Sequence, residues 1–189
     1  ICAGQVLGVR MTLLGLSCIG IMDPRGADRK RLMVFVEMDR CATDAVQSVT
    51  GCSLGKRSMK FLDYGKMAAT FLNLSTGKAV RVFAREGSRE SAHIYAPGEQ
   101  DKYAAQLKAY RIMSDNVLFA VEEVRVDVRT QDMPGRPLRR VPCDQCGEHV
   151  QDMREVVRDG RTLCIPCAHG GYYSKATDMS CGERYAKKT

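Results

Sequence analysis

The stretch CDQCGEHVQDMREVVRDGRTLCIPC, residues 143–167, decides the fold of the C-terminal part of the chain. It holds two Cys-x2-Cys pairs separated by seventeen residues, Cys143 with Cys146 and Cys164 with Cys167. Two residues between cysteines let both thiolates reach one ion, and two such pairs complete a tetrahedral zinc site. We therefore predict a zinc ribbon in which these four cysteines bind a structural zinc ion, with no coordination position left for a catalytic water.

The surrounding residues set the limits of this ribbon. Asp159-Gly160 predicts a hairpin turn between the two cysteine pairs. Residues 133–142 contain three prolines and a glycine, a composition that disfavours helix and central strand alike. We predict a core domain over residues 1–132, a linker over 133–142, the ribbon over 143–173 and a polar tail over 174–189. Cys181, in the tail, has no partner in the sequence and stays unexplained.

The composition excludes several classes of protein. Of the 189 residues, 44% are hydrophobic and 27% charged, which fits a globular chain rather than a disordered one. The longest apolar stretch, residues 11–22, is too short to cross a membrane. The net charge of +7 is spread over both halves, which argues against nucleic acid as a partner. An odd number of cysteines, nine, argues against a secreted disulfide framework, and we expect a soluble, cytoplasmic protein.

The first 132 residues predict a helix, a strand, a second helix and then several strands. Asp39 is the expected cap of the second helix and Gly51 its terminator. A change of phase in the apolar alternation at Glu122-Glu123 predicts a bulge or break in the last strand. The expected class is α+β with a mixed sheet. The expected helices are residues 4–21, 41–50 and 97–113, and the expected strands are residues 32–38, 59–64, 67–74, 79–86 and 117–128.

The candidate reactive residues of this core are mostly cysteines near helix ends. Cys41 lies in the first turn of a helix, where unpaired N–H groups stabilise a thiolate, and Asp44 lies three residues on along the same face. Cys2 likewise lies just before a helix. Cys41 and Cys52 are separated by about 16 Å of helix, so a site that uses both must be spread over a cleft. Cys18 lies on the apolar face of the first helix and is expected to fill the core.

Five segments of the core together resemble the signature of the formylmethanofuran dehydrogenase E-subunit family. They are Cys2-Ala3-Gly4, residues 7–11, residues 36–47, residues 50–56 and Asp63-Tyr64-Gly65-Lys66. The resemblance covers residues 1 to about 130 and implies an α-β-α fold followed by three strands. It also implies association with a molybdenum or tungsten formylmethanofuran dehydrogenase, although not that this chain performs the reaction.

The family pattern begins His-x-His-x-Cys-Pro-Gly, whereas the printed sequence starts one residue before that cysteine, Cys2, and has Ala3 in place of the proline. The resemblance implies that histidines upstream of Ile1 would share a second metal ion with Cys2.

Three hypotheses follow for the function. The first is an accessory metal-binding protein with a structural zinc and a cleft formed by Cys2, Cys41, Asp44 and Cys52, where a second metal ion is possible. The second is an enzyme in which those thiols and a catalytic metal act on an unknown small substrate, with Lys56 or Lys66 as an anion clamp. The third is a zinc-ribbon adaptor for protein or nucleic acid. A homodimer is expected, because a site so near the chain terminus could be completed by a second copy.

Overall fold

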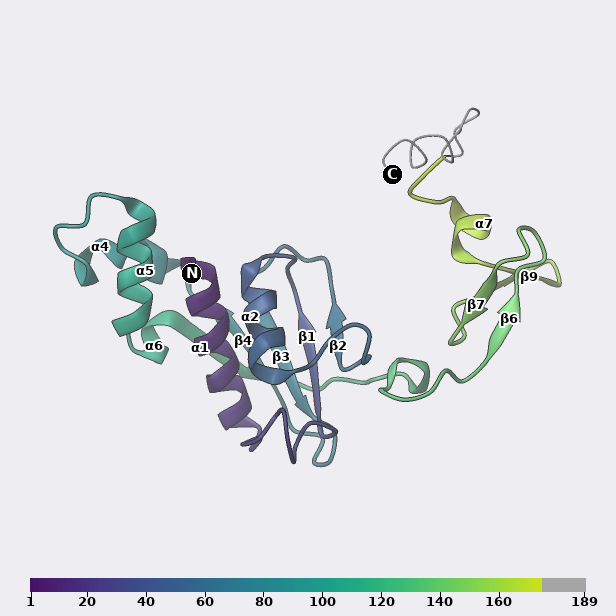
Figure 1. The fold of residues 1–189 in the computed structure, drawn as a ribbon, viewed down its shortest axis with the longest axis horizontal. Helices are drawn as coiled ribbons and strands as arrows, with labels where there is room; N and C mark the ends of the chain where they lie inside the picture. Colours follow the sequence, from purple (N-terminus) through teal and green to yellow (C-terminus); the bar gives the residue numbers. More distant parts are fainter. Residues whose placement is uncertain (175–189) are drawn as a thin grey trace, which may run out of the picture. The chain divides into compact units, whose positions relative to one another are not determined.

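The computed structural model describes residues 1–174, and the chain folds into two compact units (Figure 1). The first unit spans Ile1–Gly135 and the second begins at Arg136. Cys181 lies outside the described residues. The described part contains no helix that is both long and apolar enough to span a membrane.

The first unit is built on a five-stranded sheet in the order β2-β1-β3-β4-β5 (Figure 1). Strand β2 runs parallel to β1, and the other neighbours are antiparallel. The predicted α+β class with a mixed sheet is therefore confirmed. The strands are β1 (Leu32–Val36), β2 (Met59–Phe61), β3 (Ala68–Asn73), β4 (Ala79–Ala84) and β5 (Phe119–Glu123).

Helices α1 (Ala3–Cys18) and α2 (Cys41–Thr50) lie side by side over the sheet (Figure 1). Two glycines of α1 explain how closely it packs. A Cβ atom on Gly8 would lie 2.6 Å from the backbone oxygen of Ala42 in α2, and one on Gly15 would lie 2.2 Å from the ring of Phe71 in β3. These glycines weaken the intrinsic helix propensity but let backbone and aromatic ring approach the helix.

Helix α2 has the predicted bounds, and Gly51 ends it in the left-handed conformation with φ +68°. The expected cap was wrong, however. Arg40 occupies the N-cap position in place of Asp39, and its side chain makes no capping hydrogen bond. The hydroxyl of Thr43 instead donates to the backbone oxygen of Met38 at 2.6 Å, which fixes the entry to the helix.

The helix expected over residues 97–113 is shorter than predicted. Helix α5 (Lys102–Ile112) starts after Asp101, whose carboxylate accepts from the N–H of Ala104 at 2.7 Å. Tyr103 is 72% exposed while Tyr110 is buried, so the two tyrosines do not share the packed face. Three single-turn helices escaped prediction because they are too short to show a period: α3 (Glu86–Glu90), α4 (Ala92–Tyr95) and α6 (Asp115–Leu118).

The predicted break in the last strand is confirmed, since β5 ends at Glu123. Beyond it, three valines of the continuing chain pack against a small cluster centred on Met33, Leu72 and Ala79. A second apolar layer, apart from the main core, thus forms from Val124, Val126 and Val128.

A buried ion pair joins β4 to the end of β1. Arg81 donates to both carboxylate oxygens of Glu37, at 2.7 and 2.8 Å, and the Glu37 side chain is 6% exposed. The hydrogen bonds and charge of Glu37 raise the pKa of Arg81. This bidentate pair fixes strands that are not neighbours in the sheet.

The second unit consists of two hairpins and a short helix. Strands β6 (Arg140–Pro142) and β7 (His149–Gln151) form one hairpin, and β8 (Val156–Arg158) and β9 (Arg161–Leu163) form the other. Asp159 and Gly160 turn the second hairpin with φ values of +51° and +72°, as the Asp-Gly pair predicted. Helix α7 (Ile165–His169) follows.

Candidate functional site

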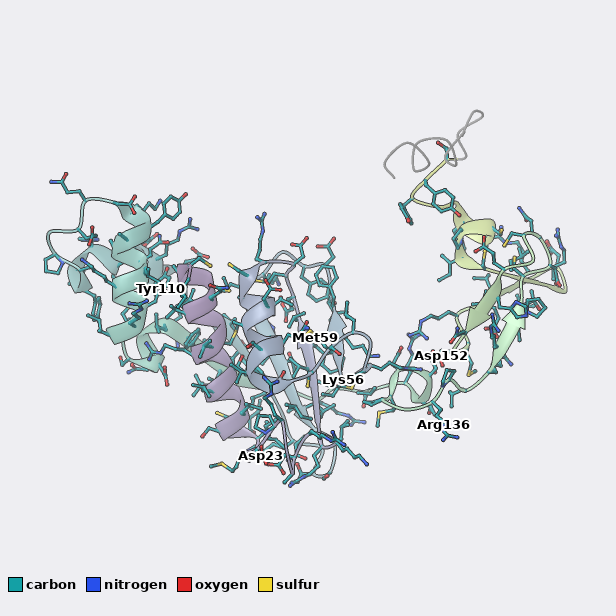
Figure 2. All side chains as sticks on the ribbon, in the orientation of Figure 1. Asp23, Lys56, Met59, Tyr110, Arg136 and Asp152 are labelled. Atoms are coloured by element: carbon teal, nitrogen blue, oxygen red, sulfur yellow. The ribbon has the colours of Figure 1, made fainter. Side chains whose placement is uncertain are left out.

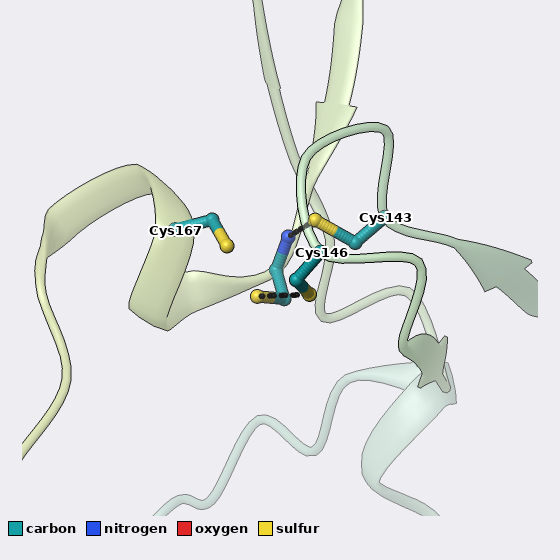
Figure 3. A group of neighbouring side chains, drawn as sticks. Cys143, Cys146 and Cys167 are labelled. Atoms are coloured by element: carbon teal, nitrogen blue, oxygen red, sulfur yellow. Dashed lines mark hydrogen bonds between the residues drawn. The ribbon is translucent and has the colours of Figure 1, made fainter. Parts of the chain in front are cut away.

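Four sulfurs meet at one end of the second unit. The Sγ atoms of Cys143, Cys146, Cys164 and Cys167 all lie within 4.8 Å of one another (Figure 3). Cys146 and Cys164 are 3.8 Å apart, which equals the spacing of about 3.8 Å between two sulfurs on a tetrahedral zinc ion with Zn–S bonds of about 2.3 Å. The donor set and the spacing both fit zinc.

Electrostatics explains why these thiols need a cation. Backbone N–H groups of Cys146 and Cys164 lower the pKa of Cys143 to about 6. The N–H of Cys164 donates to the Cys143 sulfur at 3.2 Å. By contrast, the hydrogen bond with Cys164 and burial raise the pKa of Cys167 to about 12. Four adjacent thiols cannot all ionise against one another, whereas a divalent ion makes four thiolates stable together.

A second, smaller cluster of sulfur lies in the first unit. The Sγ atoms of Cys2 and Cys41 are 2.9 Å apart, although the residues are 39 positions apart in sequence. Cys2 is the N-cap of α1, and Cys41 is the first residue of α2. Gly4 makes this approach possible, because a Cβ atom there would lie 2.8 Å from the Cys41 sulfur. We call Cys2 and Cys41 the thiol pair.

The two members of the thiol pair ionise differently. The hydrogen bond from Cys41 and the backbone N–H groups of Gln5 and Gly4 lower the pKa of Cys2. The pKa of Cys41 is raised, first by its hydrogen bond to Cys2 and then by burial. With both thiols protonated, the Cys2 thiol donates to the Cys41 sulfur. Once a proton is lost, the anion resides on Cys2 and Cys41 becomes the donor.

The other predicted residues of the core site are placed elsewhere. Asp44 is exposed on α2, and its charge contributes least among the causes that raise the pKa of Cys41. Cys52 is buried with its sulfur 3.9 Å from the backbone oxygen of Leu32, and burial raises its pKa. Lys56 donates to the backbone oxygen of Gly51 at 2.9 Å. Within residues 1–174, groups of three or more possible metal ligands within 4.8 Å occur only at the ribbon cysteines.

Comparison with known proteins accounts for both units. The profile of the family described as "FmdE, Molybdenum formylmethanofuran dehydrogenase operon" matches residues 1–125. The chain belongs to the FmdE family. The profile of the prokaryotic dksA/traR C4-type zinc finger matches residues 136–173, which contain all four ribbon cysteines. The family resemblance of the core and the zinc ribbon predicted from the cysteine spacing are thus both confirmed.

Two proteins are similar to this FmdE-family chain over most of its length. One is a protein of Archaeoglobus fulgidus named "Probable S-adenosyl-L-methionine-binding protein", 29% identical over 92% of the chain. The chain spans 50% of that relative's length. The other is the crystal structure of an FmdE-like protein of the tungsten formylmethanofuran dehydrogenase type from Syntrophus aciditrophicus. It matches 91% of this chain and 86% of its own, with a TM-score of 0.59 and 20% identity, and so shows a shared fold.

Sequence reasoning missed one buried polar residue, Gln106, in a cavity that reaches the start of α1. A cavity of about 230 Å³ is lined by Ala3 and Gly4 of α1 and by Gln106 of α5, with Arg89 and Tyr110 nearby on its wall. Gln106 is 6% exposed, and its Nε2 atom has no hydrogen-bond partner in the described structure. The available signal was a polar residue on the face that buries Ala105, Ala109 and Tyr110.

Proposed function

We propose that this FmdE-family protein is an accessory metal-binding protein in which the ribbon zinc is structural and the thiol pair is the functional site. The 2.9 Å contact between Cys2 and Cys41 carries the proposal. It brings together two soft donors from the starts of two different helices, and both cysteines lie within the residues 1–125 that the FmdE profile matches.

The chemistry of the thiol pair suits a thiophilic ion. Sulfur ligands select zinc and other soft metals, and Cys2 readily supplies the first thiolate because its pKa is lowered. Zinc bound to both sulfurs would require them to separate by about 0.9 Å, to the tetrahedral spacing. Cys2 is exposed and lies at the helix cap, so a change of its side-chain rotamer suffices.

Metal analysis of purified protein tests this proposal. Unmodified protein is expected to carry two thiophilic ions per chain. Cys2→Ser and Cys41→Ser should each reduce the content to one, and Cys146→Ser should remove the other ion. Cys18→Ser is the matched control, because Cys18 packs against the main core, and should leave both ions bound. A content of one ion per chain that Cys2→Ser leaves unchanged would sink the proposal.

The name of the family supplies the partner that we propose. An accessory protein of this kind would associate with a molybdenum or tungsten formylmethanofuran dehydrogenase and would itself form a homodimer. Light scattering checks the oligomer: a mass near 42 kDa, twice the 21.0 kDa of one chain, is expected. Co-purification with the dehydrogenase, and its loss in Cys2→Ser, would tie the partner to the thiol pair.

A second candidate function is an enzyme acting on a small substrate, favoured by the cavity of about 230 Å³ that Gln106 lines together with Ala3 and Gly4. The unpartnered Nε2 atom of Gln106 could donate to a carbonyl or carboxylate of a compound bound there. The name of the archaeal relative makes S-adenosyl-L-methionine the first compound to titrate. Binding that Gln106→Leu abolishes would favour the enzyme, and no binding by any variant would favour the accessory role.

A further inference from the structure

A larger cavity of about 680 Å³ lies in the first unit, next to the loop that leaves α2. Its floor is buried and includes Leu32 and Cys52, and its wall carries four basic side chains. We call it the cationic cavity, after Arg25, Arg29, Lys30 and Lys56. Figure 2 labels Lys56 on that loop. The volume falls within the range of about 300–1,000 Å³ that small-molecule sites occupy.

Charge is the distinctive property of the cationic cavity. No acidic residue is among those that line it, within the part of the chain that the structure describes. The nearest carboxylates on the loop are already engaged. Asp28 accepts from two backbone N–H groups and pairs with Arg31 at 2.7 Å. Asp23 accepts from the N–H groups of residues 26 and 27.

Two of the four cations are held in place without being neutralised. Arg25 donates to the backbone oxygen of Ser48 at 2.6 Å, and Lys56 donates to that of Gly51 at 2.9 Å. Both contacts fix the side chains through neutral oxygens. Arg29 and Lys30 are exposed, and neither forms an ion pair with any residue from 1 to 174. An arrangement of unpaired positive charge around a buried floor repels itself until an anion enters.

The hydroxyl groups on the floor of the cationic cavity already have hydrogen-bond partners. The Thr50 hydroxyl donates to the backbone oxygen of Val46 and accepts from the N–H of Cys52, and the Ser58 hydroxyl accepts from that of Ser53. Recognition must therefore come from the cations, while the apolar side chains of Leu32 and Pro24 contact the uncharged part of the ligand.

We propose that the cationic cavity binds a phosphorylated small molecule of nucleotide size, with its phosphates on the arginines and lysines. A guanidinium matches two phosphate oxygens at once, and two or more phosphate charges balance the four cations better than one carboxylate does. S-adenosyl-L-methionine, with its positive sulfonium, is disfavoured here for the same reason. The site is separate from the thiol pair and does not depend on it.

Calorimetric titration of the full chain with adenosine 5′-diphosphate tests the proposal. Binding is expected at 50 mM salt and should weaken at 300 mM, while uncharged adenosine should bind far less. The double variant R29Q/K30Q should weaken binding by about tenfold or more. K102Q/R111Q, with two exposed cations removed from α5, is the matched control and should bind normally.

Two further measurements make the result decisive. Because Arg29 and Lys30 are exposed and unpaired, R29Q/K30Q should melt at the same temperature as the unmodified protein, and Cys2→Ser should bind the nucleotide unchanged. Equal binding of adenosine and adenosine 5′-diphosphate would overturn the proposal, as would equal losses in the two double variants. Binding of single-stranded RNA without binding of the nucleotide would also overturn it and would indicate a nucleic-acid surface instead.

Discussion

The two units of this chain hold their folds by different means. In the unit of residues 1–135, more than twenty side chains from helices and strands form one buried apolar cluster around Phe71 and Met11. In the ribbon, the corresponding cluster is Cys143, Leu163 and Ala168, with two further cysteines packed against it. A core this small cannot offset the chain entropy of its residues, so the ribbon depends on its ion whereas the first unit does not.

Removal of the zinc ion should have the largest effect on stability. It should unfold the ribbon and leave the first unit folded. Structural zinc contributes about 10–16 kcal/mol of apparent binding free energy to small zinc domains, which is also their folding free energy. A strong chelator, or Cys164→Ser, should leave amides of residues 140–163 exchanging freely while β1, β3 and β4 stay protected. Hydrogen exchange measured by mass spectrometry resolves both regions. If the amides of β8 and β9 stay protected from exchange after chelation, the ribbon does not depend on a metal ion and the contrast between the units is wrong.

The first unit contains one polar contact whose loss should rival that of a core side chain. Arg81→Leu leaves the buried Glu37 carboxylate without its bidentate partner, which should lower the free energy of unfolding by about 3–5 kcal/mol. Arg125→Leu is the matched control. Arg125 pairs with Asp127 at 3.0 Å, but both side chains are more than 80% exposed, so no measurable loss is expected. Equal urea midpoints for the two variants would show that burial of Glu37 does not matter.

Close packing of helix on sheet should give a smaller effect. Gly15→Ala places a methyl group 2.2 Å from the Phe71 ring and should destabilise the first unit by about 1–3 kcal/mol. Gly87→Ala is the control, because Gly87 lies in α3 with open space around it, and it should be neutral or slightly stabilising. Thermal unfolding of both variants measures the difference. A neutral Gly15→Ala would mean that α1 can move away from the sheet without loss.

The sequence predicts the ribbon better than the first unit. The reason is that the ribbon is held by a few ligands close in sequence, whereas the first unit is held by many contacts between distant residues. The ribbon ligands lie close together in the chain, so the spacing of Cys143 and Cys146 alone predicts that both bind one ion. Apolar runs predict the strands of the core, but the contacts between those strands join residues far apart in sequence. Nothing in the spacing of Cys2 and Cys41 tells that their sulfurs meet, because that contact depends on how Gly4 and Gly8 let α1 pack on α2.

The same limit applies to the cationic cavity. Arg25, Arg29 and Lys30 stand out as a basic loop in the sequence, and such loops are commonly solvated. Only the fold shows that Lys56, from a separate segment, joins them over a buried floor, while Asp23 and Asp28 are turned to backbone N–H groups.

The thiol pair should respond to pH with the smallest of these effects. It sharpens the comparison because two cysteine sulfurs also meet in the first unit. The pKa of Cys2 lies below the ordinary 9.0 of a thiol and that of Cys41 lies above it. In protein freed of metal by a chelator, Cys2 should therefore become a thiolate first as pH rises and should be alkylated by iodoacetamide at a lower pH than Cys41, by severalfold in rate at about pH 8. Peptide mass spectrometry follows the alkylation of each residue.

In Cys41→Ser the pH midpoint for alkylation of Cys2 should move up towards 9.0, because the largest cause of its lowered pKa, the hydrogen bond from the Cys41 thiol, is gone. A Cys2 midpoint that does not move would show that the helix N-terminus alone, and not the meeting of two thiols, activates this residue.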